Sequence, residues 1–107
     1  MSEKKTALVV VDVQHGNTAE AWDRDGVVTR IADLIARAQA AGTPVIWIQH
    51  ESGPFVPGSD PWQIVEAVRP GDDETVIGKQ HLDAFAGTSL RAELDALGVG
   101  ALVICGA

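Results

Sequence analysis

The chain has 107 residues, enough for one domain with a single hydrophobic core. Eight basic against fifteen acidic side chains give a net charge of −7, which argues against nucleic acid and anionic membrane surfaces as partners. The single cysteine, Cys105, excludes an internal disulfide and a cysteine-rich metal site, and it suits a reducing, cytoplasmic location. The short charged N-terminus is unlike a signal peptide, and no apolar run approaches the ~20 residues of a membrane helix.

The first half of the chain predicts a strand, a helix and a second strand. Residues 6–11 are apolar and rich in β-branched side chains, as in a strand that is buried on both faces. Over residues 27–38 the apolar side chains fall on one stripe of helical period, and Gly42 suits the left-handed residue that commonly ends a helix. Residues 44–48 predict the second strand.

The second half begins with a long loop. Residues 51–73 are rich in Pro, Gly and Asp, with one short helical piece expected around residues 62–68. Long irregular segments in compact domains are often functional. The remaining predicted elements are a short strand over residues 75–77, a helix, and a strand over residues 101–105. The helix has Leu90, Leu94 and Leu97 on one face. Thr88 or Ser89 can cap its start, and Gly98 can end it.

Strands that alternate with helices in this way predict a three-layer α/β/α fold with a doubly wound, mainly parallel, Rossmann-like sheet. We expect a single domain over residues 1–107. Ligands of such sheets bind outside the carboxyl ends of the strands. The polar residues expected at this edge are Asp12, Gln14 and His15 after the first strand, Gln49, His50 and Glu51 after the second, and Lys79 and His81 after the third.

Asp12 and Lys79 are the most informative of these residues. If their strands are neighbours, a carboxylate and an amine share one cleft. Two interpretations remain open: a structural ion pair that fixes the register of the sheet, or a general base with a cationic partner. Cys105 lies within an apolar strand, where burial raises the pKa of a thiol, so we expect a core side chain rather than a nucleophile.

Metal binding is the alternative that three histidines at strand ends suggest. They lie in three separate loops without short ligand spacing, so we expect ordinary polar loop residues and no metal. The tryptophans could line a pocket, although Trp47 alternates within a strand and fits the core better.

Three stretches together resemble the isochorismatase-like cysteine hydrolases, across essentially the whole chain. They read Ala-Leu-Val-Val-Val-Asp12-Val-Gln14, then Val-Ile-Gly-Lys79-Gln-His-Leu-Asp-Ala-Phe85-Ala-Gly-Thr88-Ser-Leu90, then Leu97-Gly-Val-Gly-Ala-Leu-Val-Ile-Cys105-Gly106-Ala. The resemblance implies a hydrolase that uses an Asp-Lys-Cys triad, without a cofactor, on an amide or related C–N bond of a small molecule. It also implies a homo-oligomer.

The resemblance assigns roles to individual residues. Asp12 and Lys79 match the first two members of the triad, and we expect Gln14, Trp62 and Phe85 to contact substrate. In the family the catalytic cysteine comes a few residues after the glycine that Gly106 matches, and no cysteine occupies such a position here. We therefore expect a domain that is incomplete on its C-terminal side and a 107-residue chain that is inactive.

Several alternatives stay open beside this interpretation. The nicotinamidases of the family carry an Asp-x-His metal motif where this chain has Gln49-His50-Glu51, which argues against a metal and against that activity. A true isochorismatase acts on a vinyl ether, and no feature of the chain points to that substrate. A truncated pseudoenzyme or an oligomerisation partner is the non-catalytic alternative. Phosphoryl transfer is disfavoured, because Asp12 has no second acid two residues later and no phosphate-binding glycine loop occurs.

Overall fold

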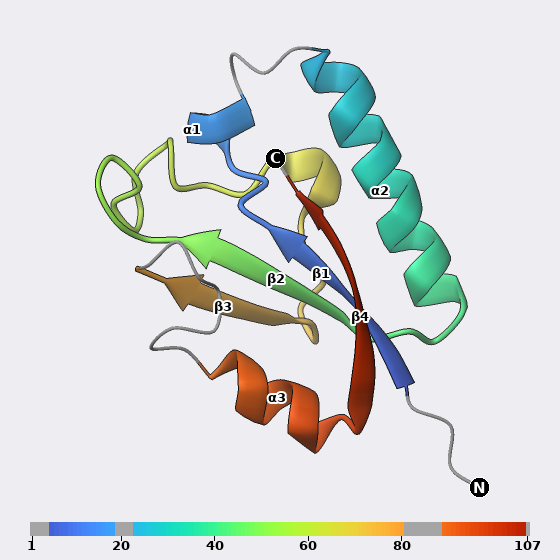
Figure 1. Ribbon diagram of the computed structural model, residues 1–107. Coiled ribbons are helices and arrows are strands. Elements are labelled where there is room, and N and C mark those ends of the chain that lie inside the picture. Colours follow the sequence, from blue (N-terminus) through green and yellow to red (C-terminus); the bar gives the residue numbers. More distant parts are fainter. Residues whose placement is uncertain (1–4, 19–22, 81–88, 107) are drawn as a thin grey trace, which may run out of the picture.

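The computed structural model describes residues 5–18, 23–80 and 89–106 (Figure 1). Its elements follow the predicted alternation of strands and helices. In chain order they are β1 (Lys5–Val11), α1 (His15–Thr18), α2 (Arg24–Ala40), β2 (Val45–His50), the 3-10 helix η1 (Glu66–Val68), β3 (Thr75–Lys79), α3 (Leu90–Ala96) and β4 (Val99–Gly106).

The four strands form one sheet in the order β3-β2-β1-β4, and every neighbouring pair is parallel. The helix α2 covers one face of this sheet and α3 the other, so the predicted three-layer α/β/α architecture is confirmed (Figure 1). Parallel strands demand crossover connections, and the helices between the strands provide them. All carboxyl ends therefore meet at one edge, which gathers the polar residues that follow β1, β2 and β3.

Two apolar cores lie on the two faces of the sheet, because successive side chains of a strand point to opposite sides. Leu8 and Val10 of β1 pack toward α2, whereas Ala7 and Val9 pack toward α3. All four are buried, as a strand covered on both faces requires. Trp47 of β2 belongs to the α2 side, as predicted for a core residue, and its indole N–H donates to the carbonyl of Val68 in η1 at 2.7 Å.

The observed elements extend the predicted ones at their ends. β2 runs on to His50, and β3 to Lys79, because the backbones of these two polar residues still pair with each other. The helix α1 was not predicted, since four residues are too few for a periodic apolar pattern. Gly42 adopts the expected left-handed conformation at φ 74°. Ser89 occupies the expected position at the start of α3, but its hydroxyl makes no capping hydrogen bond, and Thr88, the alternative cap, lies outside the described residues.

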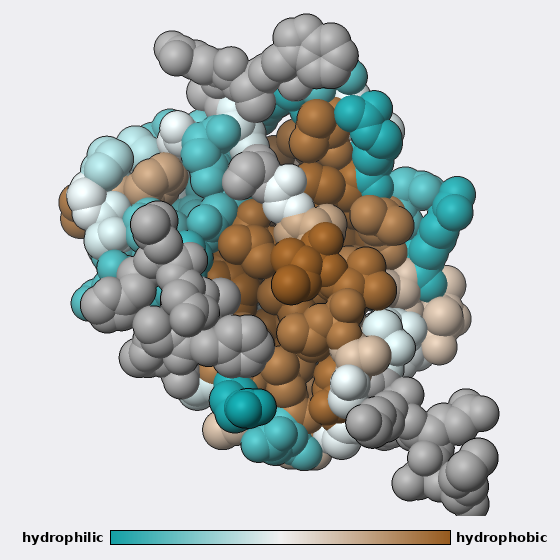
Figure 2. Space-filling model, viewed as in Figure 1, coloured by the Kyte–Doolittle hydropathy of each residue, from teal (hydrophilic) through white to brown (hydrophobic). Residues whose placement is uncertain are grey.

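The outer edge of β4 is apolar and open to solvent. Figure 2 shows hydrophobic surface gathered over β4 on the face turned toward the viewer. Val103 and Ile104 are 50% and 66% exposed although they point to opposite faces of the sheet. Such an edge is a template for pairing with further chain. Within the described ranges no helix is both long and apolar enough to cross a membrane.

Candidate active site

An ion pair lies at the carboxyl edge of the sheet. The Nζ atom of Lys79 is 3.1 Å from Oδ2 of Asp12, and the two side chains are 2% and 20% exposed. An ammonium group that is removed from water to this extent is costly unless a charge or hydrogen bonds compensate it. The carboxylate of Asp12 supplies that charge, so the structure brings together the two residues that the sequence singled out.

The strands of this pair are not neighbours, contrary to the condition set from the sequence. β2 lies between β1 and β3, and adjacent strands stand about 4.8 Å apart, so the pair bridges roughly 10 Å of backbone. The pairing of His50 with Lys79 fixes the position of the Lys79 amine along the strand direction. The N–H of Asp12 donates to the carbonyl of Ile48 at 2.9 Å, and this bond fixes the position of the Asp12 carboxylate along the same direction. A lysine has the length for this reach across the end of β2.

Asp12 turns the chain out of β1 in an uncommon backbone conformation. Its φ of 57° lies in the left-handed region, which aspartate tolerates better than most residues. Such a conformation costs of order 1 kcal/mol or more and is found most often at functional sites. Within the described part of the chain, the second carboxylate oxygen, Oδ1, is buried without a hydrogen-bond partner. One oxygen is thus held by an ammonium and the other is free to accept a proton.

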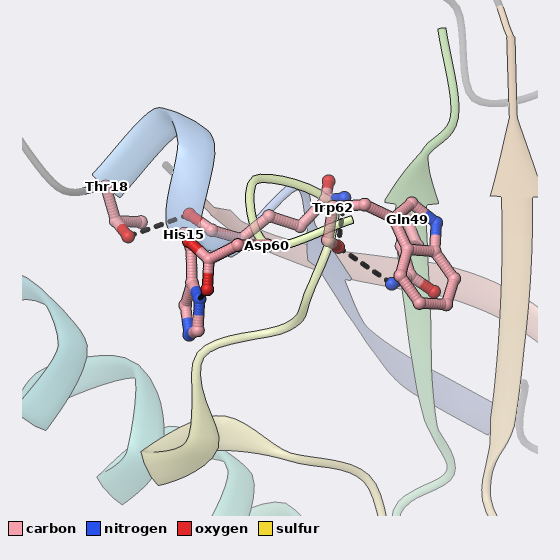
Figure 3. A network of polar contacts seen from close by, with 6 residues as sticks. His15, Thr18, Gln49, Asp60 and Trp62 are labelled. Atoms are coloured by element: carbon pink, nitrogen blue, oxygen red, sulfur yellow. Dashed lines mark hydrogen bonds and ion pairs between the residues drawn. The ribbon is translucent and has the colours of Figure 1, made fainter. Parts of the chain in front are cut away.

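A cluster of amides fixes the loop that carries Trp62. Oxygen of the Trp62 backbone accepts hydrogen bonds from Nε2 of Gln14 at 2.8 Å and from Nε2 of Gln49 at 2.9 Å. Figure 3 shows Gln49 reaching from the end of β2 to this carbonyl. The indole of Trp62 in turn donates to Oε2 of Glu51 at 3.1 Å. Both the backbone and the ring of Trp62 are therefore held beside the carboxyl ends of the strands.

Two histidines lie near this edge with separate partners. His50 contacts the hydroxyl of Ser52 through Nε2 at 2.8 Å and meets Phe55 edge-on, with ring centroids 5.3 Å apart. His15 pairs with Asp60 at 3.1 Å on the surface (Figure 3). Among the described residues no group of three or more His, Cys, Asp or Glu side chains could hold a metal ion.

Cys105 lies in β4 and takes no part in the Asp12–Lys79 pair. It packs against the core on the α2 side and pairs in register with Val10. Burial raises the pKa of its thiol, which disfavours the reactive thiolate, and the partly buried side chain packs against the core as expected. The expected site residues Phe85 and His81 lie outside the described residues.

Sequence reasoning gave Gln49 and Glu51 no role beyond their place at a strand end. The alternation of side chains along β2 places Gln49, and Glu51 just beyond the strand, on the same face of the sheet as Trp47. Gly78 of β3 provides the room for Glu51, because a Cβ at that position would collide with the Glu51 carboxylate. In the sequence the only sign of this contact was the glycine that follows a short predicted strand, and a glycine in a strand often marks the close approach of another group.

Open parallel α/β sheets bind ligands outside the carboxyl ends of their strands, and the Asp12–Lys79 pair lies at that edge. Residues 6–107 match the family model of the isochorismatase domain. The chain belongs to the isochorismatase family.

Relatives and solved structures are consistent with this assignment. A streptothricin hydrolase of Streptomyces noursei is 41% identical, over 94% of this chain and 38% of the relative. The ureidoacrylate amidohydrolase RutB of Methylobacterium radiotolerans is 31% identical, over 94% of this chain and 55% of its own length. The crystal structure of an isochorismatase family protein superposes with a TM-score of 0.86 at 30% identity, covering 95% of this chain and 63% of that one. The chain thus spans about two fifths to two thirds of the length of these proteins.

Proposed function

We propose that Asp12 and Lys79 are the base and the cation of a cysteine hydrolase that cleaves an amide or related C–N bond of a small molecule. The observation that carries the proposal is the different environment of the two carboxylate oxygens: Oδ2 of Asp12 is 3.1 Å from the ammonium of Lys79, while Oδ1 is buried without a hydrogen-bond partner among the described residues. A base needs one free oxygen in a fixed position. The name of one relative, a ureidoacrylate amidohydrolase, favours an amide-type substrate, and the name of another, a streptothricin hydrolase, favours a hydrolytic reaction.

The chemistry proceeds by covalent catalysis. Asp12 takes the proton from a cysteine thiol, and the resulting thiolate, stabilised by Lys79, attacks the carbonyl carbon of the substrate. The C–N bond breaks, the nitrogen leaves with the proton from Asp12, and an acyl-enzyme remains. Water, deprotonated by Asp12, then attacks the thioester carbon, the C–S bond breaks to release the acid, and the departing thiolate takes back the proton from Asp12. Trp62, which is held through its backbone and its ring, and Phe85 are proposed to contact the substrate.

The register of β4 indicates where the thiol would stand. Gly106 pairs with Val11, the residue before Asp12, and a Cβ on Gly106 would collide with the carbonyl oxygen of Val11. The end of β4 therefore lies beside the end of β1, where Asp12 follows. By the family resemblance the catalytic cysteine comes a few residues after the glycine that Gly106 matches, so we propose that in a family member it stands beside the Asp12 carboxylate. Cys105 points to the α2 core instead.

We further propose that this chain by itself lacks amide hydrolase activity, because its one thiol, that of Cys105, packs on the α2 side and takes no part in the Asp12–Lys79 pair. The single cysteine favours a cytoplasmic location. The apolar edge of β4 favours assembly with further copies as a homo-oligomer. The activity statement is tested by incubating the purified chain, and Cys105→Ser as a control, with streptothricin and with ureido and N-carbamoyl amides. Turnover that Cys105→Ser abolishes would contradict it.

A further inference from the structure

The side-chain amide of Gln14 is completely buried and almost fully used. Its exposure is 0%. Nε2 donates to the carbonyl of His50 at 3.0 Å and to that of Trp62 at 2.8 Å, and Oε1 accepts from the N–H of His50 at 2.9 Å. An amide has only two donor hydrogens, so neither is left for a ligand. The side chain contacts protein backbone rather than the cleft.

These bonds connect the backbones that carry the acid and the amine. Gln14 lies two residues after Asp12, and its N–H donates to the Asp12 carbonyl at 2.9 Å. His50 pairs in register with Lys79, and the next residue, Glu51, donates its N–H to the Lys79 carbonyl at 2.7 Å. The segment after β1 is therefore attached to the end of β2, which is attached to the end of β3. Asp12 and Lys79 stand at the two ends of this chain of contacts.

We propose that Gln14 is a positioning residue that sets the reach between Asp12 and Lys79. β2 separates the strands of the pair, so their side chains meet at 3.1 Å only while the ends of β1, β2 and β3 keep their relative places. The two bonds from Gln14 to His50 hold the middle strand end from the side of β1. This gives Gln14 a role different from the substrate contact that the sequence suggested. The catalytic role of the Asp12–Lys79 pair rests on the proposed function, whereas the positioning role of Gln14 is independent of it.

Gln49 provides a matched control. Its Nε2 donates to the same Trp62 carbonyl at 2.9 Å but makes no bond to the His50 backbone. Gln14→Met leaves the N–H and the carbonyl of His50 unpaired, whereas Gln49→Met leaves the Trp62 carbonyl with its bond from Gln14. The two variants remove the same chemical group from buried positions, and they differ in the attachment of His50.

The test is a pair of double-mutant cycles in urea unfolding, with Lys79→Met as the common partner. In the otherwise unchanged chain Lys79→Met should raise the unfolding constant roughly 100-fold, because it leaves a buried carboxylate unpaired. In the Gln14→Met background the pair is already loosened, so the factor should fall below about tenfold. In the Gln49→Met background it should stay near 100-fold. An equal factor in all three backgrounds would overturn the positioning role.

Gln14→Glu keeps the test decisive if Gln14→Met does not fold. A protonated glutamic acid has the shape of glutamine and can both donate and accept, whereas the carboxylate faces two carbonyl oxygens. Burial raises the pKa of such a carboxyl group in the folded state above its unfolded value of about 4.3. The folded state of this variant is therefore favoured at low pH and loses stability as the pH rises above about 4.3.

The loss of unfolding free energy on Lys79→Met is measured in the unchanged chain and in Gln14→Glu at the same pH. At pH 5 the two losses should be nearly equal. At pH 8 the loss should be much smaller in Gln14→Glu. A cost that does not vary between these values would refute the proposal. Neither measurement requires turnover. Amide turnover that does not depend on Asp12 would count against the proposed function alone, and additive cycles would count against the positioning role alone.

Discussion

Replacing Lys79 by methionine tests the energetic importance of the site. The change keeps a long side chain but removes the ammonium 3.1 Å from Asp12. Removing one partner of a buried ion pair costs about 3–5 kcal/mol, because the other charge stays buried and uncompensated. Asp12 retains 20% exposure, so water relieves part of this penalty, and we expect the lower end, about 3 kcal/mol. For a domain of ordinary stability, about 5–15 kcal/mol, this is a large loss.

The assay is equilibrium urea unfolding followed by tryptophan fluorescence. Arg37→Met is the control, because Arg37 forms an ion pair of similar length with Asp33, at 2.9 Å, but both side chains are more than half exposed. A surface pair of this kind is worth about 0.3–0.5 kcal/mol. Lys79→Met should therefore lower the free energy of unfolding several times more than Arg37→Met does. If Lys79→Met and Arg37→Met destabilise the chain equally, the buried pair has no special energetic role and the interpretation fails.

Three further predictions concern β4. Gly106→Ala should destabilise the chain by about 1–3 kcal/mol in urea unfolding, because its Cβ meets the Val11 carbonyl, a backbone atom that cannot rotate away; no measurable loss would mean that the β1–β4 contact is looser than described. Ile104→Lys should shift the chain toward monomer in light scattering, since Ile104 is 66% exposed on an uncharged edge, whereas an unchanged mass would place the association elsewhere. Iodoacetamide should alkylate Cys105 more slowly in the folded than in the unfolded chain, because burial raises its pKa. For the same reason stability should fall above pH 9.0, the unperturbed value, as the unfolded thiol ionises, and Cys105→Ala should remove that part of the pH dependence.

The order of elements and the core were predictable from the sequence, because they depend on local apolar patterns. The run from Ala7 to Val11 is apolar on both faces, and the structure buries it between α2 and α3. Gly42 and Gly98 were recognisable as helix ends, and both have positive φ. The placement of Asp12 and Lys79 at one edge followed from the rule that parallel strands share one functional edge, although their strands are not the neighbours that we expected for the pairing.

The contacts of the loop over residues 51–73 were not predictable. Gln14, Gln49 and Glu51 all attach to Trp62 or its neighbours through bonds between residues 11 to 48 positions apart, and no local pattern encodes such bonds. An amide that bonds to backbone leaves no compositional trace, since any residue can offer its carbonyl. The strand order was also undetermined, so the position of β2 between the acid and the amine became clear only in three dimensions.

The most direct test of the account joins this chain to the part of the Streptomyces noursei streptothricin hydrolase that follows the aligned stretch, and measures amide hydrolysis with and without Asp12→Asn. Circular dichroism first establishes that both proteins are folded. A general base contributes about 10²- to 10⁴-fold to the rate, and the account predicts a loss of this size in Asp12→Asn. A folded, active hybrid whose rate changes less than about threefold on Asp12→Asn, far below that range, would contradict the assignment of Asp12 as the base.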